Sequence, residues 1–114
     1  MGLCTIREQD GILIIVMPDS IDHVCALGLE KEFREFVARQ PKALLCDMSG
    51  TKYISSSALR LYLETAKAAK STGMHFGLFS LTPFADHIIT MSGFASLFAI
   101  YDTEDAAVRA ASRL

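Results

Sequence analysis

Three consecutive serines, Ser55 to Ser57, are the residues of this chain whose type and placement could do chemistry. They follow a short apolar run and precede a segment with helical spacing of apolar residues, so we expect them at the N-cap and first turn of a helix. A serine there can cap the helix, act as a nucleophile or accept a phosphate, whose charge the unpaired N–H groups of the turn would stabilise. Arg60 follows Ser56 by one helical turn and could approach a phosphate on it.

The spacing around the serines favours some of these roles over others. Serine is among the preferred N-cap residues, so a cap is the simplest role. The stretch I-S-S-S-A at residues 54–58 lacks the G-x-S-x-G pattern of a nucleophile elbow, and no His and acid stand at the positions that such enzymes use. We therefore expect no catalytic residue, and the chain is not expected to be an enzyme.

The side chains that could bind a metal ion are scattered along the chain. No pair of them has C-x-x-C or C-x-x-H spacing, and their positions are His23, His75, His87, Cys4, Cys25 and Cys46. We expect no metal site and no cofactor. Cys46 is interpreted as a small core residue.

Asp47 ends a short apolar strand, where a response-regulator receiver carries its phosphorylated aspartate. Such a receiver would also need an acidic pair after its first strand, but Asp19 has no acidic neighbour. Analogy at the level of the fold is a weak basis for function. We interpret Asp47 as a residue that orders the loop after its strand.

The elements that must position the serines alternate between strands and helices. An Asp-Gly pair at residues 10–11 predicts a hairpin, the apolar run 43–46 predicts a central buried strand, and Pro41, Gly73 and Gly93 mark helix ends. Parallel strands need helical crossovers, so this order predicts an α/β domain over residues 1–114. The predicted strands are Leu3–Glu8, Ile12–Met17, Ala43–Cys46, His75–Ser80 and Leu97–Ile100, and the predicted helices begin near Asp22, at the serines, at Pro83 and after Asp102 or Thr103. We also expect Met17, Met48, Met74 and Met91 in the core, with a place on an exposed rim as the alternative for Met91.

The composition excludes several classes of partner. The chain has 114 residues and a formal net charge of -2, with its lysines and arginines dispersed, so we expect no nucleic acid partner and no anionic membrane surface. The longest apolar run, Ile12 to Met17, is far shorter than the roughly 20 residues of a membrane span, so we expect no membrane insertion. The odd number of cysteines and the absence of a signal-peptide pattern predict a cytoplasmic protein with reduced thiols.

The segment around the serines resembles a known family. Residues 44–59 read L-L-C-D-M-S-G-T-K-Y-I-S-S-S-A-L, which is similar to the signature of STAS domains of the anti-sigma factor antagonist family. Similarity extends to the N-terminal strand pair, the helix around Phe33 and the run M-S-G-F-x-x-L-F-x-I from Met91 to Ile100. The resemblance implies a mixed sheet of about five strands flanked by about four helices. It also implies a partner, typically an anti-sigma factor that is an ATP-using serine protein kinase.

Within the serine turn, the resemblance assigns a position to each residue. Ser56 stands at the family's phosphoacceptor position and Ser57 at the Ser or Thr that follows it, with Ser55 and Ser57 as second choices for phosphorylation. Ser55 stands where the family commonly has Asp, and Ala58 where it has Gly. The residues expected to meet the partner are Asp47, Ser55, Ser56, Ser57, Ala58 and Arg60.

The resemblance and the position of the serines at a helix start imply two alternative functions. The first is an anti-sigma factor antagonist-like regulator, a signalling phosphoprotein of transcription that binds its partner through the serine turn and is switched by phosphorylation. The second is a structural STAS subunit of a signalling scaffold or a transporter-associated complex, which binds other STAS proteins and whose serines only cap a helix.

Overall fold

The chain enters its sheet through the hairpin that the Asp-Gly pair predicts. The computed structural model describes residues 4–113, and in it β1 (Thr5–Gln9) pairs antiparallel with β2 (Ile12–Val16). Asp10 and Gly11 have φ values of 52° and 81°, the positive values that a two-residue type I′ turn requires at both positions. The predicted hairpin is confirmed, although Leu3, the expected first residue of β1, lies outside the described residues.

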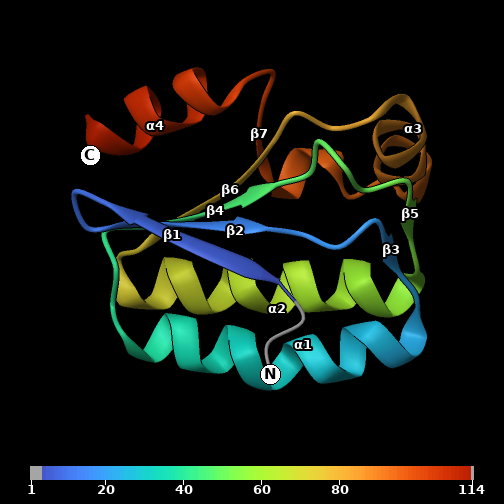
Figure 1. The fold of residues 1–114 in the computed structure, drawn as a ribbon, viewed down its shortest axis with the longest axis horizontal. Coiled ribbons are helices and arrows are strands. Elements are labelled where there is room, and N and C mark those ends of the chain that lie inside the picture. Colours follow the sequence, from blue (N-terminus) through green and yellow to red (C-terminus); the bar gives the residue numbers. More distant parts are fainter. Residues whose placement is uncertain (1–3, 114) are drawn as a thin grey trace.

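A five-stranded mixed sheet forms the centre of the molecule (Figure 1). Its strand order is β1-β2-β4-β6-β7, and every pair after the hairpin is parallel. The remaining three strands of the sheet are β4 (Ala43–Asp47), β6 (His75–Phe79) and β7 (Ala99–Tyr101). The predicted central strand is confirmed, because β4 lies between β2 and β6 and its first four residues are buried.

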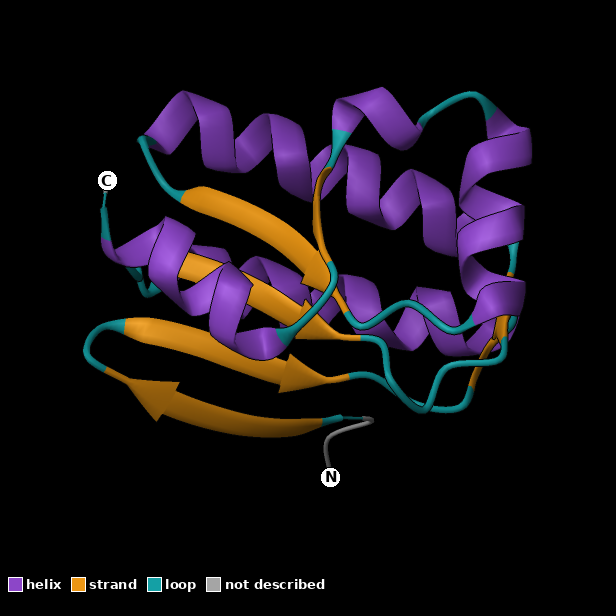
Figure 2. Cartoon of the chain, turned by 90° about the horizontal axis from the view of Figure 1, so that it is seen from above, coloured by secondary structure: helices purple, strands orange, loops and turns teal. Residues whose placement is uncertain are grey.

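Helices cover both faces of this sheet, which confirms the predicted α/β fold with its four helices. On one face lie α1 (His23–Ala38) and α2 (Ser56–Thr72), as Figure 1 shows. On the other face, α4 (Glu104–Ser112) packs on β4, β6 and β7, and Figure 2 shows it lying over the strands. Alternate residues of each inner strand therefore enter two separate cores, so the strands are apolar without a polar alternation.

The helix boundaries follow from capping residues in the sequence. Asp22 caps α1 by accepting a hydrogen bond from the backbone N–H of Cys25 at 2.8 Å. Thr82 and Thr103 cap α3 (Pro83–Ser92) and α4 in the same way. Gly73 ends α2 with a left-handed φ of 75°, as the sequence predicts.

Two further strands of two residues each, which the sequence analysis did not anticipate, lie beside the main sheet. They are β3 (Ser20–Ile21) and β5 (Tyr53–Ile54), which pair in parallel. Each of them leads into a helix, β3 into α1 and β5 into α2. The pair therefore holds the starts of these two helices side by side.

Two predictions about the last third of the chain need correction. The predicted strand Leu97–Ile100 is shifted, because Ala95–Leu97 forms a 3-10 turn and the strand runs from Ala99 to Tyr101. Met91 was expected in the core, but its side chain is 72% exposed. Met17, Met48 and Met74 are buried as expected.

Gly77 of β6 lies in close contact with residues of the neighbouring strand β7. A Cβ at Gly77 would meet Tyr101 Cε2 at 3.0 Å and the carbonyl oxygen of Ala99 at 3.2 Å. The Tyr101 hydroxyl is also held, 2.8 Å from His75 Nε2. The Tyr101 ring therefore has little freedom to move away from a Cβ at Gly77.

We expect Gly77→Ala to lower the free energy of unfolding by about 1–3 kcal/mol, the usual cost of overpacking a core. Urea denaturation followed by circular dichroism measures the change. Gly50→Ala is the matched control, because a Cβ at Gly50 meets no atom within 4 Å. Equal stability of the two variants would contradict the close packing of Gly77.

Candidate functional site

The three serines differ in exposure and in bonding. Ser55 is the N-cap of α2 and accepts a hydrogen bond from the backbone N–H of Ala58 at 3.2 Å, with its side chain only 8% exposed. Ser56 is the first residue of α2 and is exposed, whereas Ser57 is half-buried. Ser55 therefore makes the cap that holds the turn, and Ser56 presents its hydroxyl at the surface.

The serine turn is tied to the start of α1 through the β3–β5 pair. The backbone N–H of Ser55 donates to the carbonyl oxygen of Ile21 at 2.9 Å. In this register Ile21 lies beside Ile54, so the two helix caps, Asp22 and Ser55, follow the pair together. The positive ends of two helix dipoles therefore lie at the same edge of the molecule.

His23 is a residue of this site that the sequence analysis did not place there. Its Nδ1 lies 2.5 Å from Ser57 Oγ, although the two residues are 34 positions apart in the chain. A histidine beside a serine is the arrangement of a base and a nucleophile, but catalysis also needs a site that excludes water. His23 is exposed, so this pair is open to solvent.

Asp47 orders the loop after β4, as the sequence predicts. Its Oδ1 accepts a hydrogen bond from the backbone N–H of Ser49 at 3.0 Å. Further along the loop, Thr51 donates its hydroxyl to the carbonyl oxygen of Pro18 at 2.8 Å and is fully buried. The Asp47 side chain therefore forms this hydrogen bond within its own loop and not with the serine turn.

Ala58 and Arg60 lie on opposite sides of α2. Ala58 is fully buried and its side chain belongs to the core between α1, α2 and the sheet. Arg60 is exposed. A partner that approaches this turn would therefore contact Ser56 and Arg60. Ser55 and Ala58 are buried and would support the turn from inside the protein.

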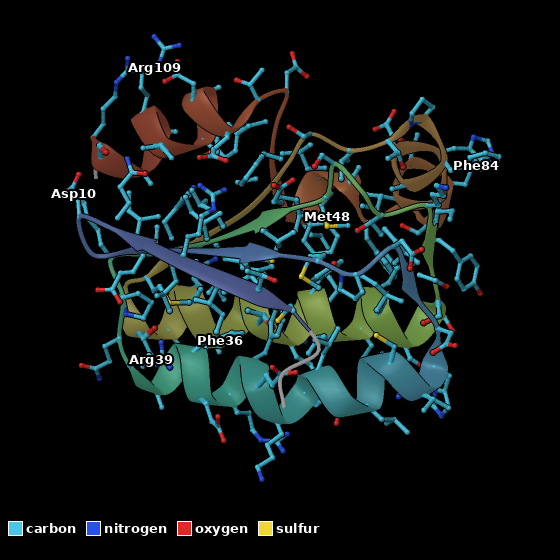
Figure 3. The ribbon with its side chains drawn as sticks, viewed as in Figure 1. Asp10, Phe36, Arg39, Met48, Phe84 and Arg109 are labelled. Carbon is cyan, nitrogen blue, oxygen red and sulfur yellow. The ribbon has the colours of Figure 1, made fainter. Side chains whose placement is uncertain are left out.

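Exposed apolar side chains lie on elements that meet at the same end of the molecule as Ser56. Val24 in the first turn of α1 is 75% exposed, Tyr53 in β5 is 49% exposed, and Phe84 in the first turn of α3 is 72% exposed. Because α3 contacts β5, these three elements share one end of the fold, where Figure 3 shows Phe84 projecting outwards. We call Val24, Tyr53, Ser56 and Phe84 the docking face.

The cysteines are not candidates for nucleophilic chemistry. Burial, together with the neighbouring charge of Glu32, raises the pKa of Cys4 to about 12. Burial also raises the pKa of Cys25 and, because its thiol is fully enclosed, raises that of Cys46 well above its usual value. The three thiols therefore stay protonated near neutral pH, and the buried position of Cys46 confirms it as a core residue.

Neither a metal-binding cluster nor a membrane-spanning helix is found in the part of the chain that the structure describes. Within residues 4–113, no group of three His, Cys, Asp or Glu side chains is placed to hold a metal ion. In the same residues, no helix has the length and apolar character needed to span a bilayer.

Comparison with known proteins places the chain in a family. The family model of the STAS domain matches residues 4–107. The chain belongs to the STAS domain family. This STAS domain is 29% identical to BtrV of Bordetella bronchiseptica, provisionally named an anti-sigma factor antagonist, over 93% of this chain and 91% of that protein.

Solved structures agree with this assignment. The crystal structure of an anti-sigma factor antagonist from Mycobacterium paratuberculosis is 28% identical, with a TM-score of 0.86 over 96% of this chain and 92% of that one. A protein of Thermotoga maritima shares the fold, with a TM-score of 0.88 at 22% identity over 96% of this chain and 95% of that one. The chain is thus an anti-sigma factor antagonist-like STAS protein, as its signature predicts.

The capping role of Ser55 gives a testable prediction. We expect Ser55→Ala to lower the free energy of unfolding by about 1 kcal/mol, because the Ala58 N–H loses its acceptor. Ser55→Asp keeps an acceptor and should stay within about 0.5 kcal/mol of the wild type. Ser56→Ala is the matched control, since Ser56 is exposed and does not cap α2. Denaturant titration measures all three, and an equal loss in Ser55→Ala and Ser56→Ala would contradict the assignment.

Proposed function

We propose that this protein binds an anti-sigma factor with ATP-dependent serine kinase activity through the docking face, and that phosphorylation of Ser56 releases the partner. The observation that carries the proposal is the position of Ser56, an exposed hydroxyl at the end of the fold where Val24, Tyr53 and Phe84 are also exposed. The family of the chain and the names of its relatives support a partner of this class.

The exposed apolar side chains explain how the unmodified protein would bind. Tyr53 and Phe84 are aromatic, and aromatic side chains supply much of the binding energy at protein interfaces. Large apolar side chains that stay in water at a monomer's surface indicate an interaction site when they gather in one place. Ser56 shares the end of the fold with these side chains, so a partner bound there would desolvate its hydroxyl.

A phosphate on Ser56 would change this surface in charge. It would add about -1.5 to -2 charges at neutral pH to the first turn of α2. That turn contains no acidic side chain, so the free N–H groups of the helix would stabilise the phosphate within the protein. Desolvating the phosphate against an apolar partner would cost far more than desolvating a hydroxyl. The modified protein would therefore bind more weakly.

Phosphorylation itself can be tested directly. The protein is incubated with ATP and an anti-sigma factor that is a serine kinase, and intact mass is compared between wild type and Ser56→Ala. We expect one phosphate on the wild type and none on the variant. Ser57→Ala is the control and should still be modified. A wild type that remains unmodified would remove the switch from the proposal.

The docking face makes a separate prediction about affinity. We expect Tyr53→Ala and Ser56→Asp each to weaken binding of the unmodified protein to this partner by about tenfold or more, because one removes an aromatic anchor and the other adds a charge. Met91→Ala is the control, since Met91 is equally apolar and exposed but lies at the far end of α3. Calorimetric titration gives the affinities. Loss of binding only in Met91→Ala would place the interface elsewhere.

A second candidate function is a structural subunit that assembles with other STAS domains. It is favoured by Met91 and by Leu97, which are exposed on α3 and on the turn that follows it. Light scattering separates the two functions, because a large homo-assembly that Met91→Asp dissolves would support the scaffold.

A further inference from the structure

The contact between His23 and Ser57 has no part in the function proposed above. His23 is the first residue of α1 and Ser57 the second residue of α2, and the β3–β5 pair brings the two helix starts together. The distance between His23 Nδ1 and Ser57 Oγ is 2.5 Å, a short hydrogen bond. The ring therefore holds this hydroxyl whichever of the two atoms carries the proton.

The two serines that follow the cap are consequently unequal. Ser56 is exposed, and Ser57 is half-buried with its hydroxyl turned towards α1. The family resemblance ranks Ser56 before Ser57, but both are hydroxyls in the same helical turn, and their residue type does not separate them. The structure distinguishes them through a side chain from another helix.

We propose that His23 is a specificity-determining residue that directs phosphorylation to Ser56 by occupying the hydroxyl of Ser57. The inference rests on the proposed function. In the transfer, Ser56 Oγ would form a bond to the terminal phosphorus of the partner's ATP, while the bond from that phosphorus to the ADP oxygen breaks. ADP leaves with that bonding electron pair, and the serine proton passes to a base of the kinase.

The geometry of such a transfer explains why His23 matters. The attacking and leaving oxygens must lie roughly in line with the phosphorus, so the attacking hydroxyl has to point at the nucleotide. Ser57 Oγ points at the imidazole instead, and it would first have to rotate away and give up its hydrogen bond. The net contribution of one hydrogen bond in a protein changes the ratio of the bonded to the rotated hydroxyl by about fivefold.

Phosphosite mapping by fragmentation mass spectrometry, after incubation with ATP and the same anti-sigma factor kinase, tests the assignment. We expect phosphate on Ser56 alone in the wild type, and a fraction on Ser57 that rises about fivefold or more in His23→Ala. His23→Asn, whose amide can still bond the hydroxyl, should restore the wild-type pattern. His87→Ala is the matched control, because His87 is an exposed histidine on α3.

Three other outcomes of this experiment would contradict the proposal, each in a different part. An unchanged site distribution in His23→Ala would show that His23 does not select the serine. Phosphate on Ser57 in the wild type that disappears in His23→Ala would show the opposite role, in which His23 acts as the base that activates Ser57. Absence of phosphate from every variant would overturn the switch itself, and the selection with it.

Discussion

The parallel pairing of β3 with β5 is the constraint on which the site depends. Only four residues form it, but Ile21 and Ile54 are both buried, and the backbone N–H of Lys52 donates to the carbonyl oxygen of Asp19 at 2.7 Å. A parallel pair places the residues that leave it at the same edge. Both helices that leave this pair therefore begin next to each other, and His23 reaches Ser57.

Core packing then decides which serine faces the solvent. One side of α2 is buried through Leu59 and Tyr62, and the Tyr62 ring contacts the rings of Phe33, Phe76 and Phe98 at centroid distances of 6.2 to 6.4 Å. This packing fixes the rotation of the helix about its axis. Residues four and eleven positions after Ser56, Arg60 and Lys67, fall on the same helical stripe as Ser56, and all three are exposed. The exposure of Ser56 is therefore set by aromatic side chains deep in the core.

Much of the fold could be predicted from the sequence because its signals are local. The Asp-Gly turn, the apolar run of β4 and the cap at the serines each depend on neighbouring residues, and the structure agrees with them. Met91 was misplaced because the apolar side of α3 is wider than its buried side, so periodicity did not reveal that Ala85 and Ile89 form the inner face while Met91 stays exposed. A two-residue strand has no periodicity at all, and this explains why β3 and β5 were not predicted.

The candidate site was predictable in part for the same reason. The cap and the exposed hydroxyl follow from where a helix begins, but the contact of His23 with Ser57 joins two segments 34 residues apart. A histidine just after an Asp cap carries no signal that points to a particular serine. The register of the β3–β5 pair and the packing of α1 against α2 bring the two together.

The same geometry shows the structural effect of Ser55 and Ala58, the two residues at which the serine turn differs from the family's common pattern. Ser55 makes the cap bond that an Asp would make, and the methyl group of Ala58 lies fully inside the core. Both differences therefore affect how the start of α2 is held, and neither changes the side chains that a partner would meet. Replacing Asp by Ser also removes a negative charge beside Ser56. A phosphate would then bring negative charge to a turn that has no acidic side chain of its own, so modification would change the local charge from neutral to negative.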